Sequence, residues 1–286
     1  MKKIIFIFTI LLFTYSCQEV IDIELEDGET RLVVDALFEV STEEEGSLPY
    51  AENGIKLSLT APYFDEEIPS VSDAVVYITN LSDQSITYFE ESDESGFFTV
   101  ENGGTFIPEF DVDYELTVVY NNETYVSTTQ LIPSVSIDSL AQEDGVLFEG
   151  NEIEVVVEFT DEAPREDYYL IDFDFDLYVL TEDTFYQGQT FNFSYYYEME
   201  DAMVGKEIEI KISGIDENYY NYFNLLLEQT SQDGNPFQSP PTLLKGNILN
   251  TTNADNYAFG YFRISESDTE YIVIKDPEDL QDSDEE

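Results

Sequence analysis

This sequence of 286 residues carries 63 acidic and 10 basic side chains, which gives a formal net charge of −53 at pH 7. A polyanion of this strength repels nucleic acid and anionic membrane surfaces, although it attracts cations and cationic ligands. The chain has no histidine, which excludes serine–histidine and cysteine–histidine catalysis, histidine-ligated zinc and histidine-ligated haem. Hydrophobic residues make up 42% of the chain, enough to build packed cores and to exclude general disorder.

The N-terminus has the order typical of a bacterial lipoprotein signal peptide. Two lysines precede an apolar run at 4–13, and a short segment then leads to Cys17, the single cysteine of the sequence. The run holds about ten residues, whereas a spanning helix needs roughly 20. We therefore predict a signal peptide over 1–16, lipid (palmitate) attachment at Cys17 and an acidic tether over 17–30. A plain secretory signal is the alternative, and it would leave Cys17 as an unpaired thiol.

After the tether, the sequence is a series of short β-prone runs separated by turn residues. Residues 55–59 alternate strictly between apolar and polar side chains, which predicts a half-buried strand. Residues 114–120 and 124–128 flank a short polar turn and predict a hairpin. About seven such strands within about 100 residues are typical of a β-sandwich. Pro133 closes the block because proline cannot donate to a sheet ladder, so we predict an N-terminal β-sandwich domain over 31–133.

The second block combines strands with one change of hydrophobic period. Strands are predicted at 152–159, 168–180, 191–197, 207–212, 258–262 and 271–274. Helical spacing is shown by the apolar residues Tyr219, Tyr220, Phe223, Leu226 and Leu227. With Asp216 as a suitable N-cap, they predict one amphipathic helix over about 216–232. We therefore predict an all-β fold of two Ig-like β-sandwich domains, the second over 134–275 with this helix packed on it, followed by an acidic tail over 276–286.

The C-terminal third carries a distinctive series of motifs. A tyrosine-rich helix is followed by Asp233-Gly234-Asn235-Pro236-Phe237-Gln238-Ser239-Pro240-Pro241, then Lys245-Gly246-Asn247-Ile248, and then Ala258-Phe259-Gly260-Tyr261-Phe262. Three segments earlier in the sequence accompany these motifs: Cys17 with Val20-Ile21-Asp22-Ile23, Leu32-Val33-Val34, and Ile137-Asp138-Ser139-Leu140. Over nearly the whole mature chain, the sequence resembles a family of Bacteroidota lipoproteins catalogued as domain of unknown function 4249.

The resemblance implies an outer-membrane lipoprotein and offers no catalytic residues to carry over, and we expect no cofactor. Members of this family are typically encoded beside TonB-dependent receptors. We therefore expect an accessory or binding protein of a TonB-dependent nutrient uptake system, anchored in the outer membrane and displayed at the cell surface. Its expected partners are the receptor and a cargo, which the acidity suits if the cargo is cationic or metal-containing, although solubility explains the acidity equally well. A structural or adhesive surface protein is the alternative, and a hydrolase is a more distant one.

Three acidic residues, Asp172, Asp174 and Asp176, alternate with apolar residues within 168–180. On a strand, all three carboxylates face the same way, about 6.5 Å apart from one to the next. Calcium prefers oxygen ligands, so these residues are candidate calcium ligands, yet a straight strand cannot bring three such side chains within about 2.5 Å of one ion. The simpler interpretation is a solvated sheet face with no metal.

The loop at 235–241 holds Phe237 among three prolines and polar residues. Long irregular loops either pack under a sheet or carry function, so Phe237 is a candidate contact for a partner or ligand, with packing against the helix as the alternative. Carboxylate pairs of the kind used in glycoside hydrolysis are uninformative here, because 63 acids supply any spacing by chance. We predict no catalytic residues, and lipid attachment at Cys17 is the one specific role assigned.

Overall fold

The computed structural model describes residues 28–41, 53–62, 65, 67–143, 152–198, 204–230 and 242–276. The predicted signal peptide, the predicted lipid attachment residue Cys17 and the loop that holds Phe237 lie outside these residues, as does almost all of the acidic tail. Within them, strands predominate and one α-helix is present, α2 (Glu217–Thr230). The predicted all-β class with a single helix is confirmed.

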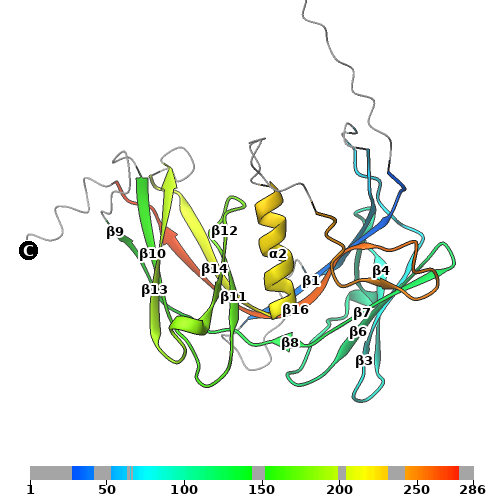
Figure 1. Ribbon diagram of the computed structural model, residues 1–286, viewed down its shortest axis with the longest axis horizontal. Coiled ribbons are helices and arrows are strands. Elements are labelled where there is room, and N and C mark those ends of the chain that lie inside the picture. Colours follow the sequence, from blue (N-terminus) through cyan, green and yellow to red (C-terminus); the bar gives the residue numbers. More distant parts are fainter. Residues whose placement is uncertain are drawn as a thin grey trace, which may run out of the picture.

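The strands form one large sheet and one small sheet (Figure 1). Their bounds are β1 (Leu32–Ser41), β2 (Ile55–Leu59), β3 (Val75–Asn80), β4 (Ile86–Glu91), β5 (Phe97–Val100), β6 (Tyr114–Tyr120), β7 (Glu123–Thr129), β8 (Leu131–Ile132), β9 (Ile137–Glu143), β10 (Glu152–Thr160), β11 (Tyr168–Asp172), β12 (Tyr178–Glu182), β13 (Thr190–Glu198), β14 (Glu207–Ile215), β15 (Leu249–Asn250) and β16 (Phe259–Val273). The large sheet has the order β12-β11-β14-β16-β1-β2-β5-β4-β3-β6-β7-β15, with β8 beside β16, and the small sheet has the order β13-β10-β9.

The N-terminal half comprises β1 to β7 and β15 with the first part of β16, and its core is built by alternation. Buried side chains occupy every second position of β1, namely Leu32, Val34, Ala36, Phe38 and Val40. The ring of Phe38 lies 5.8 Å from Phe89, 5.3 Å from Phe106 and 6.3 Å from Phe262, each in an edge-to-face arrangement. These contacts join β1, β4 and β16 around one core.

The C-terminal half comprises β9 to β14 with the rest of β16, and here the small sheet packs on the end of the large one. Its core contains alternate residues of β10 and β14, all fully buried, which are Val155, Val157 and Phe159 together with Ile208, Ile210 and Ile212. Inward alternation on both facing sheets is the packing of a β-sandwich.

Helix α2 stands between the two halves, over β16 (Figure 1). Its N-terminus is capped by Asp216, whose Oδ1 accepts the backbone N–H of Tyr219 at 2.7 Å. The ring of Tyr219 stacks on Phe223 at 5.5 Å and meets Tyr261 of β16 edge-on at 4.9 Å. The helix is thus fixed by an aromatic cluster, as predicted for a helix packed on the sheet. No helix among the described residues is long and apolar enough to cross a membrane.

Strand β16 belongs to both halves. It pairs in parallel with β1, from Val33↔Phe259 to Ser41↔Ser267, and antiparallel with β14, from Ser213↔Ser267 to Glu207↔Val273. The predicted strands at 258–262 and 271–274 are therefore one continuous strand, and the prediction of two strands is wrong. The polar residues between them are buried because they are hydrogen bonded: Ser265 Oγ donates to the Gly214 carbonyl at 2.6 Å, and Asp268 Oδ2 accepts the Ile137 N–H at 2.6 Å.

A charged cluster connects the three strands where the halves meet. Glu39 of β1 lies between Arg263 of β16 and Lys211 of β14, with Oε1–Nη2 and Oε2–Nζ distances of 2.7 Å and 2.9 Å. Arg263 is 3% exposed, and its guanidinium carbon also lies 4.7 Å from the centre of the Tyr219 ring. Its Nε and Nη1 atoms are buried without a hydrogen-bond partner. Glu39 is therefore the main electrostatic compensation for a buried cation.

Candidate functional site

The prediction that Asp172, Asp174 and Asp176 lie along one face of a strand is wrong. The segment 168–180 is a hairpin, β11 and β12, and its turn places Asp174, Phe175 and Asp176 at φ values of 64°, 54° and 60°. The carboxylates stabilise this turn, because Asp172 Oδ1 accepts the Asp174 N–H at 3.0 Å and Asp174 Oδ1 accepts the Phe175 N–H at 2.7 Å. With Glu209 they line an open depression of 430 Å³.

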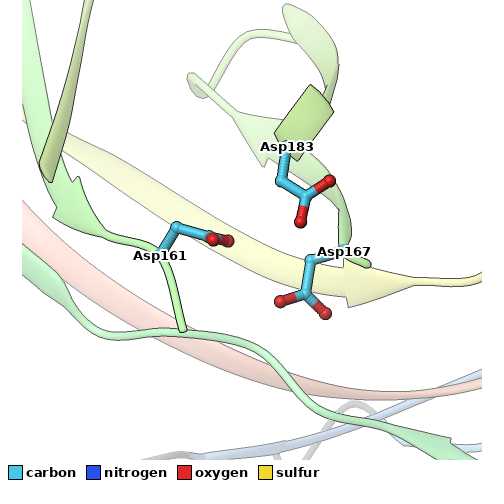
Figure 2. Close-up of side chains that lie close together, drawn as sticks. All are labelled: Asp161, Asp167 and Asp183. Carbon is cyan, nitrogen blue, oxygen red and sulfur yellow. The ribbon is translucent and has the colours of Figure 1, made fainter. Parts of the chain in front are cut away.

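Three other aspartates converge more closely. Asp161 follows β10, Asp167 precedes β11, and Asp183 begins the 3₁₀ helix η2 (Asp183–Phe185) after β12. Each offers a carboxylate oxygen, and these oxygens all lie within 4.8 Å of one another (Figure 2). The three residues are 4%, 5% and 5% exposed. Across the part of the chain that the structure describes, no other three acidic residues meet in this way. We call this group the aspartate triad.

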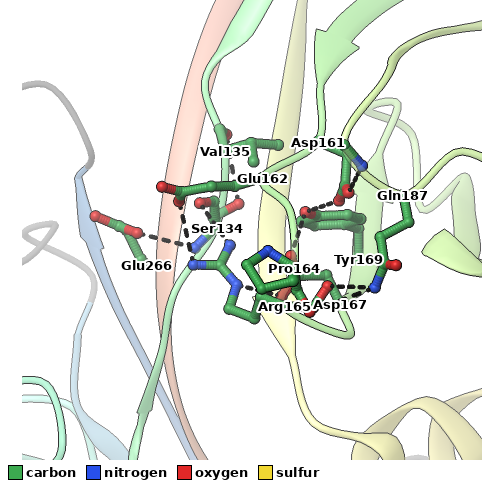
Figure 3. Close-up of polar contacts among 11 residues, drawn as sticks. Ser134, Val135, Asp161, Glu162, Pro164, Arg165, Asp167, Tyr169, Gln187 and Glu266 are labelled. Atoms are coloured by element: carbon green, nitrogen blue, oxygen red, sulfur yellow. Dashed lines mark hydrogen bonds and ion pairs between the residues drawn. The ribbon is translucent and has the colours of Figure 1, made fainter.

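Hydrogen bonds fix two members of the aspartate triad (Figure 3). Asp161 Oδ1 accepts the hydroxyl of Tyr169 at 2.7 Å, and its Oδ2 accepts the backbone N–H of Gly188 at 2.7 Å. Asp167 Oδ1 accepts the Nε–H of Arg165, and its Oδ2 lies 3.1 Å from the same Tyr169 hydroxyl. Because a hydroxyl has a single proton to donate, Tyr169 cannot fully satisfy both acceptors.

The third member is left unsatisfied. Asp183 Oδ2 is buried and has no hydrogen-bond partner, which is uncommon and unfavourable for a polar atom in a protein interior. The one guanidinium beside the triad, that of Arg165, also contacts Glu162 Oε2 and the Ser134 carbonyl oxygen, both at 3.4 Å. The pocket therefore has an excess of negative charge and a shortage of donors.

The pKa values of the neighbouring groups reflect this environment. Burial raises the pKa of Asp167, and the adjacent Arg165 guanidinium opposes that rise. Burial, reinforced by the hydrogen bond to Asp161, raises the pKa of the Tyr169 hydroxyl well above its usual range. Tyr169 is therefore a neutral donor at any physiological pH, and it cannot serve as a base.

The aspartate triad is missing from the sequence-based candidates because each member resembles an ordinary loop acid in a chain with 63 of them. Two members bound the loop between β10 and β11 and the third follows β12, so no local spacing pattern reveals the group. A usable signal is the rare base Arg165, one of 10 basic residues, which is surrounded in sequence by Asp161, Glu162, Glu166 and Asp167.

A second feature is an apolar row on the outer face of the N-terminal half. Tyr88, Tyr77, Thr117, Val126 and Leu249 are successive cross-strand partners on β4, β3, β6, β7 and β15. Directly opposite residues share one face of a sheet, so these side chains form a row without a charge. Thr117 in its middle is buried, and Tyr77 and Val126 beside it are half-buried. The Tyr77 and Tyr88 rings lie 5.6 Å apart, and Tyr88 and Leu249 are 45% and 65% exposed.

Neighbouring positions widen this apolar row. Val75 and Ile86 each lie two residues before a tyrosine of the row, on the same face of the sheet, and both are exposed. Glu115 pairs with Thr79, which itself pairs with Ile86, so a carboxylate borders the apolar surface. An apolar centre with a polar border is typical of a protein-binding surface.

A cleft of 590 Å³ lies where the described chain begins, and Arg31 and Tyr257 are among its lining residues. The guanidinium carbon of Arg31 lies 4.2 Å from the centre of the Tyr257 ring, and Lys245 Nζ lies 3.6 Å from the same centre. Arg31 also contacts the carboxylate of Glu29 and donates to the Asp255 carbonyl at 2.6 Å. Its guanidinium is thus committed to partners within the protein.

Comparison with curated proteins finds no match. The family model described as Domain of unknown function (DUF4249) matches residues 18–270. That range contains the aspartate triad, the apolar row, helix α2 and nearly all of β16. Since the match covers most of the chain, the protein belongs to the DUF4249 family.

Proposed function

We propose that the protein is a non-catalytic, lipid-anchored accessory protein of the outer membrane that docks on a TonB-dependent receptor and assists nutrient uptake. The apolar row carries this proposal. An antiparallel sheet with one face on a core normally presents polar side chains to water on the other. Here that face holds tyrosine, valine and leucine in a chain of net charge −53.

The chemistry of the row favours a protein as its ligand. Exposed apolar side chains gathered on one face are characteristic of protein–protein contacts, and tyrosine is enriched among the residues that dominate binding energy. Tyr77 and Tyr88 provide two adjacent rings at one end of the row, and Leu249 provides an exposed aliphatic side chain at the other. The row crosses five strands of one sheet, so it is presented on a rigid scaffold.

Sequence features support attachment of the protein to the outer membrane and a binding role for it. The lipoprotein-type N-terminus with Cys17, together with DUF4249 membership, supports attachment to the outer membrane beside an uptake receptor. A chain without histidine lacks the commonest general base, which supports binding over catalysis. The acidic surface suits a cationic or metal-containing cargo, which the receptor would carry across the membrane.

The test is a pull-down of the tagged native lipoprotein from gently solubilised outer membranes, followed by mass spectrometry. We expect a stoichiometric TonB-dependent receptor with the native protein. We expect roughly tenfold less receptor with the double variant Tyr88→Ser/Leu249→Ser, because a loss of about 1.4 kcal/mol in binding is a tenfold change. Both side chains are exposed, so their truncation leaves the core intact.

The matched control is Tyr271→Ser/Val273→Ser on β16, which also removes one tyrosine and one aliphatic side chain, at positions 57% and 50% exposed. We expect it to recover the receptor normally. Equal loss with both double variants, or normal recovery with the row variant, would refute docking through this face. Recovery of the lipoprotein alone, where other receptor complexes survive, would refute the uptake role and favour a free-standing adhesive protein.

A further inference from the structure

We propose that the aspartate triad, Asp161, Asp167 and Asp183, is a calcium site that braces one end of the C-terminal half. This inference is independent of the proposed receptor-docking role, since it concerns a different half of the molecule. Two of the carboxylates come from the two ends of the loop between β10 and β11 and the third from the start of η2, and they face one another (Figure 2). Their oxygens lie within 4.8 Å of one another, so small side-chain rotations bring all three within the 2.3–2.6 Å or so that calcium requires.

The unsatisfied oxygen is the observation that points to a ligand. Asp183 is only 5% exposed, its carboxylate faces the other two (Figure 2), and its Oδ2 atom is buried without any donor. A buried carboxylate oxygen without a donor is strongly unfavourable. A cation placed among the three side chains would supply the missing interaction for Asp183.

The charge balance specifies a divalent ion. The three carboxylates have one guanidinium beside them, that of Arg165. It binds Asp167, and it also contacts Glu162 and the Ser134 carbonyl (Figure 3). The net charge of this group is therefore −2 when all three acids are ionised. One divalent cation neutralises it, whereas a monovalent cation leaves a buried charge uncompensated.

The ligand chemistry favours calcium over other divalent ions. All three side chains offer oxygen, with no sulfur or imidazole, which disfavours zinc and copper. Magnesium demands a near-ideal octahedron at about 2.0–2.1 Å and retains several waters. Three aspartates of low exposure, two of which are already held by Tyr169, Gly188 and Arg165, suit the larger ion with its flexible geometry.

An ion at this position would add to the backbone hydrogen bonds that already join these parts of the chain, such as the one from the Asp183 N–H to the Asp167 carbonyl at 3.1 Å. Asp161 and Asp167 bound the loop between β10 and β11, and Asp183 begins η2 after β12. Through Arg165, which contacts the Ser134 carbonyl, the same site reaches the connection between β8 and β9. Calcium would therefore stabilise the C-terminal half chiefly by fixing these turns relative to one another.

The experiment is calorimetric titration and thermal unfolding of the full chain, purified in mild detergent and freed of metal with a chelator. We expect one calcium per chain, and a rise in Tm of roughly 5–10 °C at one hundred times the dissociation constant. Magnesium at the same concentration is expected to act far more weakly. Terbium provides a second measurement, because a bound terbium ion beside Tyr169 is expected to show tyrosine-sensitised emission that calcium displaces.

Asp183→Asn is the decisive variant, since it keeps the shape of the side chain and alters a carboxylate oxygen that has no partner in the protein. We expect it to fold, to bind calcium at least tenfold more weakly and to lose the terbium signal. Asp176→Asn, at the exposed turn between β11 and β12, is expected to behave like the wild type. The proposal is overturned if the wild type shows neither calcium heat nor a Tm shift, or if Asp183→Asn retains both.

Discussion

Replacing Glu39 with glutamine is expected to lower the free energy of unfolding by about 3–5 kcal/mol, the range found when one partner of a buried ion pair is removed. The carboxylate faces Arg263 Nη2 at 2.7 Å and Lys211 Nζ at 2.9 Å. Arg263 is 3% exposed and already has two nitrogen atoms without a partner. A neutral amide would therefore leave a buried guanidinium with its charge uncompensated.

Urea unfolding measures this effect. Glu270→Gln is the control, because Glu270 is an exposed acid on β16, and surface changes usually stay within about 0.5 kcal/mol. Adding Arg263→Met to Glu39→Gln is expected to cost less than the sum of the single changes by about 0.5–3 kcal/mol. If Glu39→Gln is no more costly than Glu270→Gln, the ion cluster does not stabilise the fold.

The same cluster predicts that the stability of the protein depends on pH. Burial by itself would raise the pKa of Glu39, but the nearby Arg263 and Lys211 outweigh it, and the net pKa lies below the ordinary value of 4.5. A carboxyl whose pKa is lowered by folding stabilises the protein above its ordinary pKa and loses that contribution as the pH falls through the folded value. The gap between the wild type and Glu39→Gln is therefore expected to close below pH 4.5, a trend that unfolding at several pH values would reveal or disprove.

Gly260→Ala is expected to be more damaging still and to abolish soluble expression or cost more than about 4 kcal/mol. Gly260 has φ +103°, and a Cβ atom there would lie 1.9 Å from the Val34 carbonyl oxygen on β1. Because Val34 and Gly260 are register partners, relief of this clash requires separation of β1 from β16. The loss would therefore reach both halves of the molecule.

Gly103→Ala separates the steric clash from the strain of a positive φ. Gly103 also has a positive φ, +66°, but a Cβ atom there meets nothing within 4 Å. It is expected to cost only the backbone strain of about 1–2 kcal/mol. Soluble yield and thermal unfolding of the two variants make the comparison. Similar melting temperatures would show that the approach of β16 to β1 tolerates a methyl group.

Local sequence patterns were sufficient to predict the helix and the regularly alternating strands. Asp216 and the spacing of Tyr219, Tyr220 and Phe223 predicted a helix over about 216–232, and α2 spans Glu217–Thr230 with Asp216 as its cap. The alternation at 55–59 corresponds to β2. Both signals are local, because capping and periodic burial depend on residues only a few positions apart.

The wrong strand predictions have a common cause: the role of a polar residue depends on its hydrogen-bond partners, which a pattern of apolar and polar residues does not show. Asp172, Asp174 and Asp176 appeared to continue a strand, but two of their carboxylates accept backbone N–H groups and stabilise a turn. Ser265 and Asp268 lie between the strands predicted at 258–262 and 271–274, yet their partners in β14 and β9 allow them to be buried within one strand. The aspartate triad shows this most clearly, since its three carboxylates meet only after the β10–β11 loop and the start of η2 have been brought together.

The position of β16 also constrains when the chain can fold. It is the last of the described strands, yet its register partners on β1 begin at Val33, more than two hundred residues earlier in the numbering. Pairing strands so far apart in the sequence, and in parallel, is slow. Until β16 is in place, the edges of β1 and β14 that it covers are unpaired and prone to aggregation. Neither half can therefore complete its part of the large sheet before β16 has been synthesised. Late, concerted closure suits a polypeptide that must remain unfolded during export, as the signal peptide predicted over 1–16 would require.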